Sequence, residues 1–209
     1  MKAIIFDFDG VILDSVNVKT KAFKLLYEEY GPEIQKKVVK YHLDHGGISR
    51  FEKFKFYHKN FLNKEISENE LSLLGSKFSS LVFEKVCSSN YISGALEFLN
   101  FSSKKYLTFI CTGTPYDEIV KVLDYKKLDK YFDHVYGSPM TKIEIIKQIQ
   151  DKYKISNKEI LFIGDAITDY NASSDTKVNF IGVKNNDTQF PKNVTEVNDL
   201  MEIKKIKNL

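Results

Sequence analysis

The sequence predicts an α/β fold: a parallel sheet with helices on both faces, interrupted after its first strand by an inserted helical segment. Two observations support this prediction. Short apolar runs alternate with helical stretches from residue 105 onward, and the opening run has the same continuous apolar character. Strands of this kind are typical of parallel sheets that are covered on both faces. Residues 15–90, in contrast, have mostly helical spacing and no convincing strand.

The expected elements follow one another along the chain. The first strand lies in the opening stretch Ala3–Ser15, which reads AIIFDFDGVILDS. Glycine, proline and polar breaks divide the inserted segment into four expected helices, at about residues 15–29, 32–43, 49–62 and 67–86. Later strands are expected at residues 106–111, 134–137, 160–163 and 178–183, with helices between them. The Lys-rich tail, residues 193–209, predicts a closing helix.

Because the opening strand resembles the later ones, it is expected to join their sheet. This predicts an α/β core domain of residues 1–14 and 91–209 and a helical cap domain of residues 15–90. The hinges are expected near Leu13-Asp14 and near residues 88–90.

Composition limits the classes of function. The 209 residues include 43% hydrophobic residues, enough for a sizeable core, and the net charge of +3 argues against a nucleic-acid surface while permitting an anionic small ligand. Aspartates interrupt the N-terminal apolar run, and no later run is long enough to span a bilayer, so we expect no membrane partner and a cytoplasmic location. Cys87 and Cys111 are expected to be buried reduced thiols. A monomer and a homodimer are both compatible with the sequence.

Two aspartates follow the opening strand, one residue apart. Alternation along a strand would point Asp7 and Asp9 in the same direction, and Gly10 permits a turn directly after them. Two close carboxylates repel each other, so a divalent metal is an expected partner. The alternative is a solvated Asp-Gly turn. A calcium loop fits less well, because Gly10 directly follows the second aspartate.

A second acidic strand end occurs at Gly164-Asp165, and Asp169 follows four residues later. These aspartates could be two helix caps. We favour one acidic site shared with Asp7 and Asp9, because an apolar strand ends in acid on two occasions. Carboxylates, water and a substrate phosphate are ligands that suit Mg²⁺.

Two segments between the acidic ones offer groups that bind anions. Thr112 and Gly113 follow an apolar strand, where a hydroxyl and backbone N–H groups can hold an anion, although such a pair is usually only a turn. Lys142 begins an amphipathic helix, whose positive end gives a lysine no stabilisation. A lysine is usually a solvated surface charge, and this position is only a mild indication of a binding role.

Together, DFDGVILDS, Thr112, Lys142 and GDAITD resemble, in order and spacing, the four motifs of the haloacid dehalogenase superfamily, in its helical-cap phosphatase branch. The resemblance implies a Rossmann-like, doubly wound core with strand order 3-2-1-4-5. It also implies roles for individual residues. Asp7 would be the nucleophile that forms an aspartyl-phosphate, and Asp9 would be the general acid and base.

The same resemblance implies the ligands of metal and phosphate. Magnesium would be held by the carboxylates of Asp7, Asp165 and Asp169 and by the backbone carbonyl of Asp9. The phosphoryl group would be bound by Thr112, Gly113 and Lys142. The implied activity is hydrolysis of a small phosphomonoester, such as a sugar phosphate or a phosphoglycolate-like compound. A dehalogenase is disfavoured because it needs no acid at Asp9.

One alternative is a sugar-phosphate mutase, because HGGISRFEKF resembles the substrate loop of beta-phosphoglucomutases. Arg50 and Lys53 are then candidate substrate ligands, although a pair three residues apart on a helix usually forms a solvated face. Lys19, where those mutases are expected to carry histidine, and Gly164 depart from the mutase pattern.

The other alternative is a phosphate-binding module without turnover. A phospho-receiver domain is disfavoured by the chain length, by the helical insertion and by the early position of the acidic strand. His42 and His45 flank the same loop, and the sequence assigns them no role.

Overall fold

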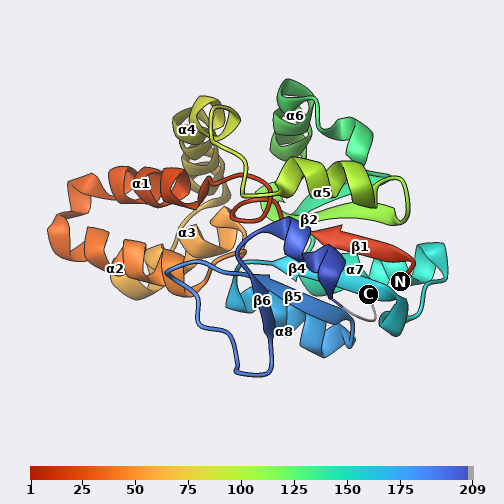
Figure 1. Cartoon of the computed structure of the whole chain (residues 1–209). Coiled ribbons are helices and arrows are strands. Elements are labelled where there is room, and N and C mark those ends of the chain that lie inside the picture. Colours follow the sequence, from red (N-terminus) through yellow and green to blue (C-terminus); the bar gives the residue numbers. More distant parts are fainter. Residues whose placement is uncertain (207–209) are drawn as a thin grey trace.

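The computed structural model describes residues 1–206 and contains a six-stranded parallel sheet with the order β3-β2-β1-β4-β5-β6 (Figure 1). The strands are β1 (Ala3–Phe6), β2 (Leu107–Pro115), β3 (His134–Ser138), β4 (Ile160–Gly164), β5 (Asn179–Val183) and β6 (Thr195–Val197). The helices are α1 (Val16–Leu26), α2 (Pro32–Asp44), α3 (Arg50–Phe61), α4 (Glu68–Cys87), α5 (Ala95–Ser102), α6 (Tyr116–Lys126), α7 (Lys142–Tyr153) and α8 (Ile167–Thr176). Short 3₁₀ helices cover Glu28–Tyr30, Asp129–Tyr131, Asn157–Glu159 and Leu200–Lys205.

Strand β1 lies in the centre of the sheet, between β2 and β4. Its first residue, Ala3, is in register with Leu107 and Ile160, and Phe6 is in register with Ile110 and Ile163. The expected order 3-2-1-4-5 is confirmed, with β6 added beyond β5. The connections that leave β1 and β4 run to opposite sides, which opens a crevice at the carboxyl ends of these two strands.

The sheet is buried on both faces, as the continuous apolar strands predicted. Alternate residues of β1 divide between two cores: Ile4 and Phe6 belong to one, and Ala3 and Ile5 to the other. Helices α5 and α6 supply Phe98 and Val122, among others, to the first core, while α7 and α8 cover the opposite face. The strands are therefore held rigidly, and their carboxyl ends are fixed relative to one another.

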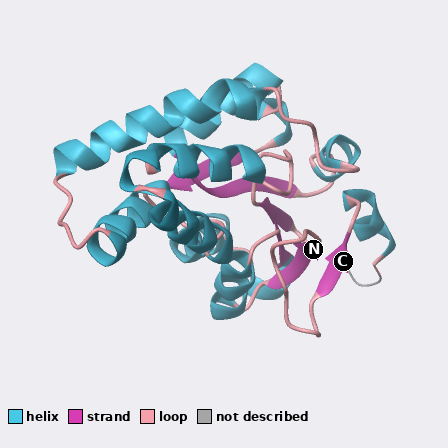
Figure 2. Ribbon diagram, turned by 90° about the vertical axis from the view of Figure 1, so that its left-hand side faces the viewer, coloured by secondary structure: helices cyan, strands magenta, loops and turns pink. Residues whose placement is uncertain are grey.

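Helices α1–α4, residues 16–87, form a helical segment at the carboxyl edge of the sheet (Figures 1 and 2). Its interior is rich in aromatic side chains. Phe23 packs against Phe54, Tyr57 and Phe78, with ring centroids 4.5–5.9 Å apart. These aromatic rings give the helical segment an apolar interior that is continuous with the core on one face of the sheet.

The two connections between the sheet and the helical segment run side by side. Ile92 N–H donates to the carbonyl of Ile12 at 3.0 Å, and Asp14 N–H donates to the carbonyl of Asn90 at 2.9 Å. Leu13 and Tyr91 form an antiparallel bridge. The chain therefore enters and leaves the helical segment through one short paired ribbon.

The tail differs from the expected closing helix. Residues 195–197 form β6, which pairs with β5, and residues 200–205 form a 3₁₀ helix. The expected helix also included residues 207–209, which lie outside the described part of the chain. Val197, Leu200 and Ile203 are buried at intervals of three, a spacing that suits a 3₁₀ helix as well as an α-helix. The free edge of β5 explains why the first of these residues lies in a strand instead.

Both cysteines are buried and free, as expected. Within residues 1–206, the helices are all too short or too polar to cross a membrane.

Candidate active site

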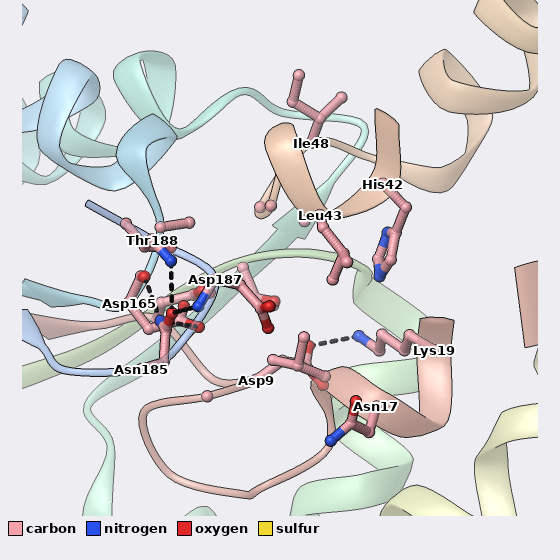
Figure 3. Close-up of a pocket in the computed structure, with 18 of the residues that line it drawn as sticks. Asp9, Asn17, Lys19, His42, Leu43, Ile48, Asp165, Asn185, Asp187 and Thr188 are labelled. Carbon is pink, nitrogen blue, oxygen red and sulfur yellow. Dashed lines mark hydrogen bonds and ion pairs between the residues drawn. The ribbon is translucent and has the colours of Figure 1, made fainter. Parts of the chain in front are cut away.

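A cavity of about 440 Å³ lies between the carboxyl ends of the strands and the helical segment (Figure 3). Asp7, Asp9, Thr112, Gly113 and Asp165 line it from the side of the sheet. Its volume falls within the usual range for small-molecule sites, about 300–1,000 Å³. The structure thus brings the sequence-predicted residues of three separate strand ends to one cavity.

Asp7 directly follows β1 and is held by its backbone. Its N–H donates to the carbonyl of Ile163 at 2.9 Å, which ties it to the end of β4. Its carboxylate is buried, with Oδ2 lying 3.2 Å from the Nζ of Lys142. Within the described chain, Oδ1 has no hydrogen-bond partner. Burial raises the pKa of Asp7 to about 7, opposed by Lys142 and reinforced by the charges of Asp169 and Asp9.

Asp165 and Asp169 complete an acidic group with Asp7. One carboxylate oxygen from each of the three lies within 4.8 Å of the others. Burial and the neighbouring charges of Asp7 and Asp169 raise the pKa of Asp165 well above its usual value. The turn at Gly10 makes room for this group: its φ is +80°, and a side chain there would overlap the carboxylate of Asp165.

Asp169 also has a structural role at the start of α8. Its Oδ2 accepts a hydrogen bond from the Ala166 N–H at 3.1 Å, and its Oδ1 pairs with the ammonium group of Lys142. Asp169 is therefore a helix cap, as one alternative predicted, and it also pairs with Lys142 and lies in the acidic group.

Lys142 is the first residue of α7, and its buried ammonium group lies between Asp7 and Asp169. These two carboxylates raise its pKa even though burial acts in the opposite direction. Two carboxylates thus compensate for the unfavourable position of a lysine at a positive helix end. Thr141 caps the helix together with Glu144, which fixes the base of the Lys142 side chain.

The acidic group fits magnesium. Three buried carboxylates face one buried ammonium group, so the group has a net negative charge when all three are ionised, and a hard divalent cation would neutralise it. The donors are oxygens, which Mg²⁺ prefers, and Oδ1 of Asp7 has no partner among residues 1–206.

Asp9 does not join this group with its side chain. Its carboxylate turns toward the helical segment, where it pairs with Lys19 (Figure 3), accepts from Ser15 Oγ at 2.6 Å and accepts from Thr114 Oγ1 at 3.2 Å. The regular strand ends at Phe6, so alternation no longer sets the direction of side chains at Asp9. Although burial opposes ionisation, Lys19 and these hydrogen bonds lower the pKa of Asp9.

Thr112 and Gly113 lie in the last part of β2, beside a loop of the helical segment. Thr112 is buried, and its Oγ1 accepts a hydrogen bond from the Thr114 N–H at 3.2 Å. A side chain at Gly113 would overlap the carbonyl of Gly47. The loop that follows α2 therefore rests directly against the strand end.

Arg50 and Lys53 are both buried, at 5% and 2% exposure, so the alternative of a solvated helix face is wrong. The guanidinium of Arg50 binds both carboxylate oxygens of Glu118 on α6, at 2.9 and 2.5 Å, and also donates to Ser79 at 2.9 Å. Arg50 lines the cavity, but its charge is already neutralised by a residue of the core.

Sequence reasoning did not identify two residues of the cavity wall, His42 and Lys19. His42 is buried, lines the cavity and contacts Lys53, and Lys19 binds Asp9. Lys19 was notable in the sequence only as a departure from the mutase pattern. Neither contact has a local sequence signal, because each depends on how separate elements pack.

A family model described as haloacid dehalogenase-like hydrolase matches residues 4–183 of the chain. The chain belongs to this hydrolase family. Among the haloacid dehalogenase-like hydrolases it resembles the "Phosphorylated carbohydrates phosphatase" of Thermotoga maritima, with 27% identity over 137 residues. That match covers 64% of this chain and 59% of the Thermotoga protein, so the chain spans less than two thirds of that relative's length.

Solved structures of similar fold cover nearly the whole chain. A "predicted phosphoglycolate phosphatase" from Haemophilus somnus has a TM-score of 0.76 and 19% identity, and the match covers 98% of this chain and 97% of that one. The protein YfnB of Bacillus subtilis, in a magnesium-bound structure, has a TM-score of 0.71 and 19% identity, and the match covers 100% of this chain and 99% of that one. At these identities, the likeness shows a haloacid dehalogenase-like fold.

Proposed function

We propose that this chain is a magnesium-dependent phosphatase that hydrolyses a small phosphomonoester through an aspartyl-phosphate on Asp7. The observation that carries the proposal is the division of the two aspartates after β1. Asp7 faces Lys142 and the acidic group, whereas Asp9 faces Lys19 and two hydroxyl groups. A nucleophile and a proton-transfer group are needed at separate positions, on either side of the reacting phosphorus.

In the first step, a carboxylate oxygen of Asp7 attacks phosphorus and the bond from phosphorus to the ester oxygen breaks. Asp9 begins this step protonated, although Lys19 and its hydrogen bonds favour the carboxylate in the unliganded protein, and it gives its proton to the departing ester oxygen, so the product is an alcohol. Lys142, with the Thr112 hydroxyl and the Gly113 N–H, holds the phosphoryl oxygens during this transfer. Positioning and charge stabilisation of this kind account for most of the catalysis of phosphoryl transfer.

In the second step, water attacks the aspartyl-phosphate and Asp9 accepts its proton. The bond between phosphorus and Asp7 breaks, which releases inorganic phosphate and restores the carboxylate. Lys19, Ser15 and Thr114 stabilise the ionised form of Asp9, which is the form that accepts this proton.

Asp7 and Asp165 would hold magnesium, with Asp169 and the Asp9 carbonyl as further ligands, and the ion would supply positive charge against the repulsion between carboxylate and phosphate. The acidic group supports this assignment, and the magnesium-bound YfnB structure provides a precedent within the same fold.

We further propose that residues 15–90 act as a cap that excludes bulk water during the reaction. The loop after α2 contacts the catalytic edge: the Thr168 hydroxyl donates to the carbonyl of Gly46, and a side chain at Gly47 would overlap Lys142. The name of the Thermotoga relative supports a phosphorylated carbohydrate as the type of substrate.

A phosphate-release assay tests the proposal. Purified protein with magnesium is incubated with sugar phosphates, phosphoglycolate and nucleotides, and inorganic phosphate is measured. We expect release from at least one ester, its loss in Asp7→Asn, and a phosphorylated Asp7 peptide in mass spectra of the quenched reaction. An absence of release throughout the panel, with no effect of Asp7→Asn, would contradict the proposal and favour a binding module. Interconversion of sugar-phosphate isomers with little release would indicate a mutase.

A further inference from the structure

Lys53 presents a buried positive charge that no carboxylate neutralises. Its side chain is 2% exposed, and its Nζ lies 2.9 Å from the Nδ1 of His42 and 3.4 Å from the His42 carbonyl oxygen. In the described chain, it forms no ion pair with Asp or Glu. Burying an ammonium group with so few partners is costly, so this arrangement requires an explanation.

The other positive charges of the same cavity wall are compensated. Lys19 is paired with Asp9, and Arg50 is paired with Glu118. The cavity-lining residues of the helical segment include these three cations and no acidic residue. Lys53 is therefore the one cation of this wall that has no acidic partner within residues 1–206.

His42, which contacts Lys53, has a second buried polar atom without a partner in the described part of the chain. When the Lys53 ammonium donates to Nδ1, the neutral ring carries its hydrogen on Nε2. That Nε2 is buried and has no partner in the described part of the chain. The imidazole points into the cavity (Figure 3) and packs against Phe23, with ring centroids 4.7 Å apart. The pair thus presents N–H donors on the wall of the cavity that the helical segment forms.

An anion beside this pair would satisfy both groups. Burial and the charges of Lys19 and Lys142 lower the pKa of Lys53 to about 7, and burial lowers the pKa of His42. A bound anion would hold the proton on Lys53 and accept hydrogen bonds from the ammonium group. Lys53 and Asp7 line the same cavity of about 440 Å³, so a small molecule bound there has access to both.

We propose that the substrate carries a second anionic group, a carboxylate or another phosphate, which Lys53 binds with the help of His42 while the scissile phosphate lies at Asp7. This inference rests on the proposed phosphatase function and narrows its substrate class. The enzyme would then prefer phosphomonoesters that are also acids over neutral sugar phosphates or alkyl phosphates.

The test uses matched esters that differ only at the far end. One series carries a carboxylate and begins with 2-phosphoglycolate, a second carries a second phosphate, and a third consists of alkyl phosphates of the same lengths, beginning with ethyl phosphate. For the chain length that is hydrolysed best, we expect kcat/KM of the ester from one charged series to exceed that of the alkyl phosphate of equal length by about tenfold or more. A difference of this size corresponds to one charge-assisted hydrogen bond. The series with the larger ratio identifies the second group.

Two lysine variants assign the preference to a residue. In Lys53→Met the ratio is expected to fall toward one, whereas Lys59→Met, an exposed change on the same helix, keeps the wild-type ratio. Thermal unfolding of both variants checks that they are folded. A ratio near one in the wild type, or a preference that survives Lys53→Met, would overturn the inference while leaving the phosphatase function in place.

Binding without turnover separates the two proposals. The Asp7→Asn protein, with magnesium, is titrated calorimetrically with 2-phosphoglycolate, the shortest bisphosphate and ethyl phosphate. We expect tighter binding of one acidic ligand, lost when Lys53→Met is added. If no ester is hydrolysed at all, the proposed function fails, and this titration still decides whether the second anionic group is recognised. Equal binding of all three ligands would then overturn the inference as well.

Discussion

Arg50 of α3 and Glu118 of α6 form a buried two-point ion pair that joins the helical segment to the core. Ser79 of α4 adds a hydrogen bond to the same carboxylate at 2.5 Å. The guanidinium also lies over the ring of Phe78, with 4.4 Å between its central carbon and the ring centroid. Because these groups come from three helices, the pair fixes how the helical segment rests on the core.

Removing one member of this pair should destabilise the protein strongly. Glu118→Gln leaves the Arg50 charge buried and uncompensated, and we expect a loss of about 3–5 kcal/mol in the free energy of unfolding, as for other broken buried pairs. Replacing both residues, as Arg50→Met with Glu118→Leu, should recover much of that loss. Urea unfolding of Arg50→Met, Glu118→Leu and the double variant measures the coupling. Additive losses would show that the pair contributes no specific interaction.

The acidic group should bind magnesium, and binding should stabilise the folded protein. Magnesium is expected to raise the Tm of the wild type, because it relieves the repulsion among three buried carboxylates. Asp165→Asn should reduce that rise, and Glu196→Gln, an exposed change on β6, should leave it intact. Thermal unfolding with and without a chelator measures both effects. An equal rise in Asp165→Asn and the wild type would place the metal elsewhere.

The stability of the unliganded protein should depend on pH through Lys53. Its folded-state pKa, about 7, lies below the usual value of 10.5, because burial disfavours the charged form. The unfolded chain therefore binds more protons between these values, so stability should rise as pH increases from about 7 toward 10.5. The advantage of Lys53→Met is expected to be largest near pH 7 and to shrink toward pH 10. Urea unfolding at several pH values provides the measurement, and a difference that is constant with pH would contradict it.

Gly113→Ala should impair the reaction more than it impairs folding. A methyl group there would overlap the carbonyl of Gly47, so the loop after α2 would be displaced from the strand end. We expect kcat/KM to fall about tenfold or more, because the phosphate ligands would be misplaced. Gly31→Ala, at an uncrowded position with a φ of +83°, is a control for backbone strain. This variant should lower the free energy of unfolding and leave kcat/KM unchanged. Unchanged kinetics for Gly113→Ala would show that the contact is dispensable.

The family resemblance implied the sheet order, and the two acidic strand ends predicted that Asp7 and Asp165 lie close together, as the structure has them. Thr112 and Lys142, which the resemblance added to this site, line the same cavity and contact Asp7, respectively. The sequence did not predict that the Asp9 side chain points away from the acidic group and toward Lys19. That direction depends on where β1 stops and on Lys19, whose position follows from the packing of the helical segment.

Contacts between side chains that are distant in the chain could not be predicted from the sequence either. Arg50 and Glu118 are far apart in the chain, and nothing near Arg50 indicates which carboxylate will reach it. Lys53 and His42 lie on successive helices, and a lysine is usually exposed. Their burial depends on how the helices pack around the aromatic interior of the helical segment, which the sequence does not specify locally.

The contact between Lys19 and Asp9 limits how freely evolution can exchange the inserted helices. Lys19 belongs to α1, while Asp9 and Thr114, which it also contacts at 2.7 Å, belong to the core. A different insert on the same core would therefore change the acid strength of Asp9 together with the shape of the cavity. In the proposed mechanism, substrate specificity and proton transfer by Asp9 would therefore change together, even though the residues that carry them lie in different parts of the sequence.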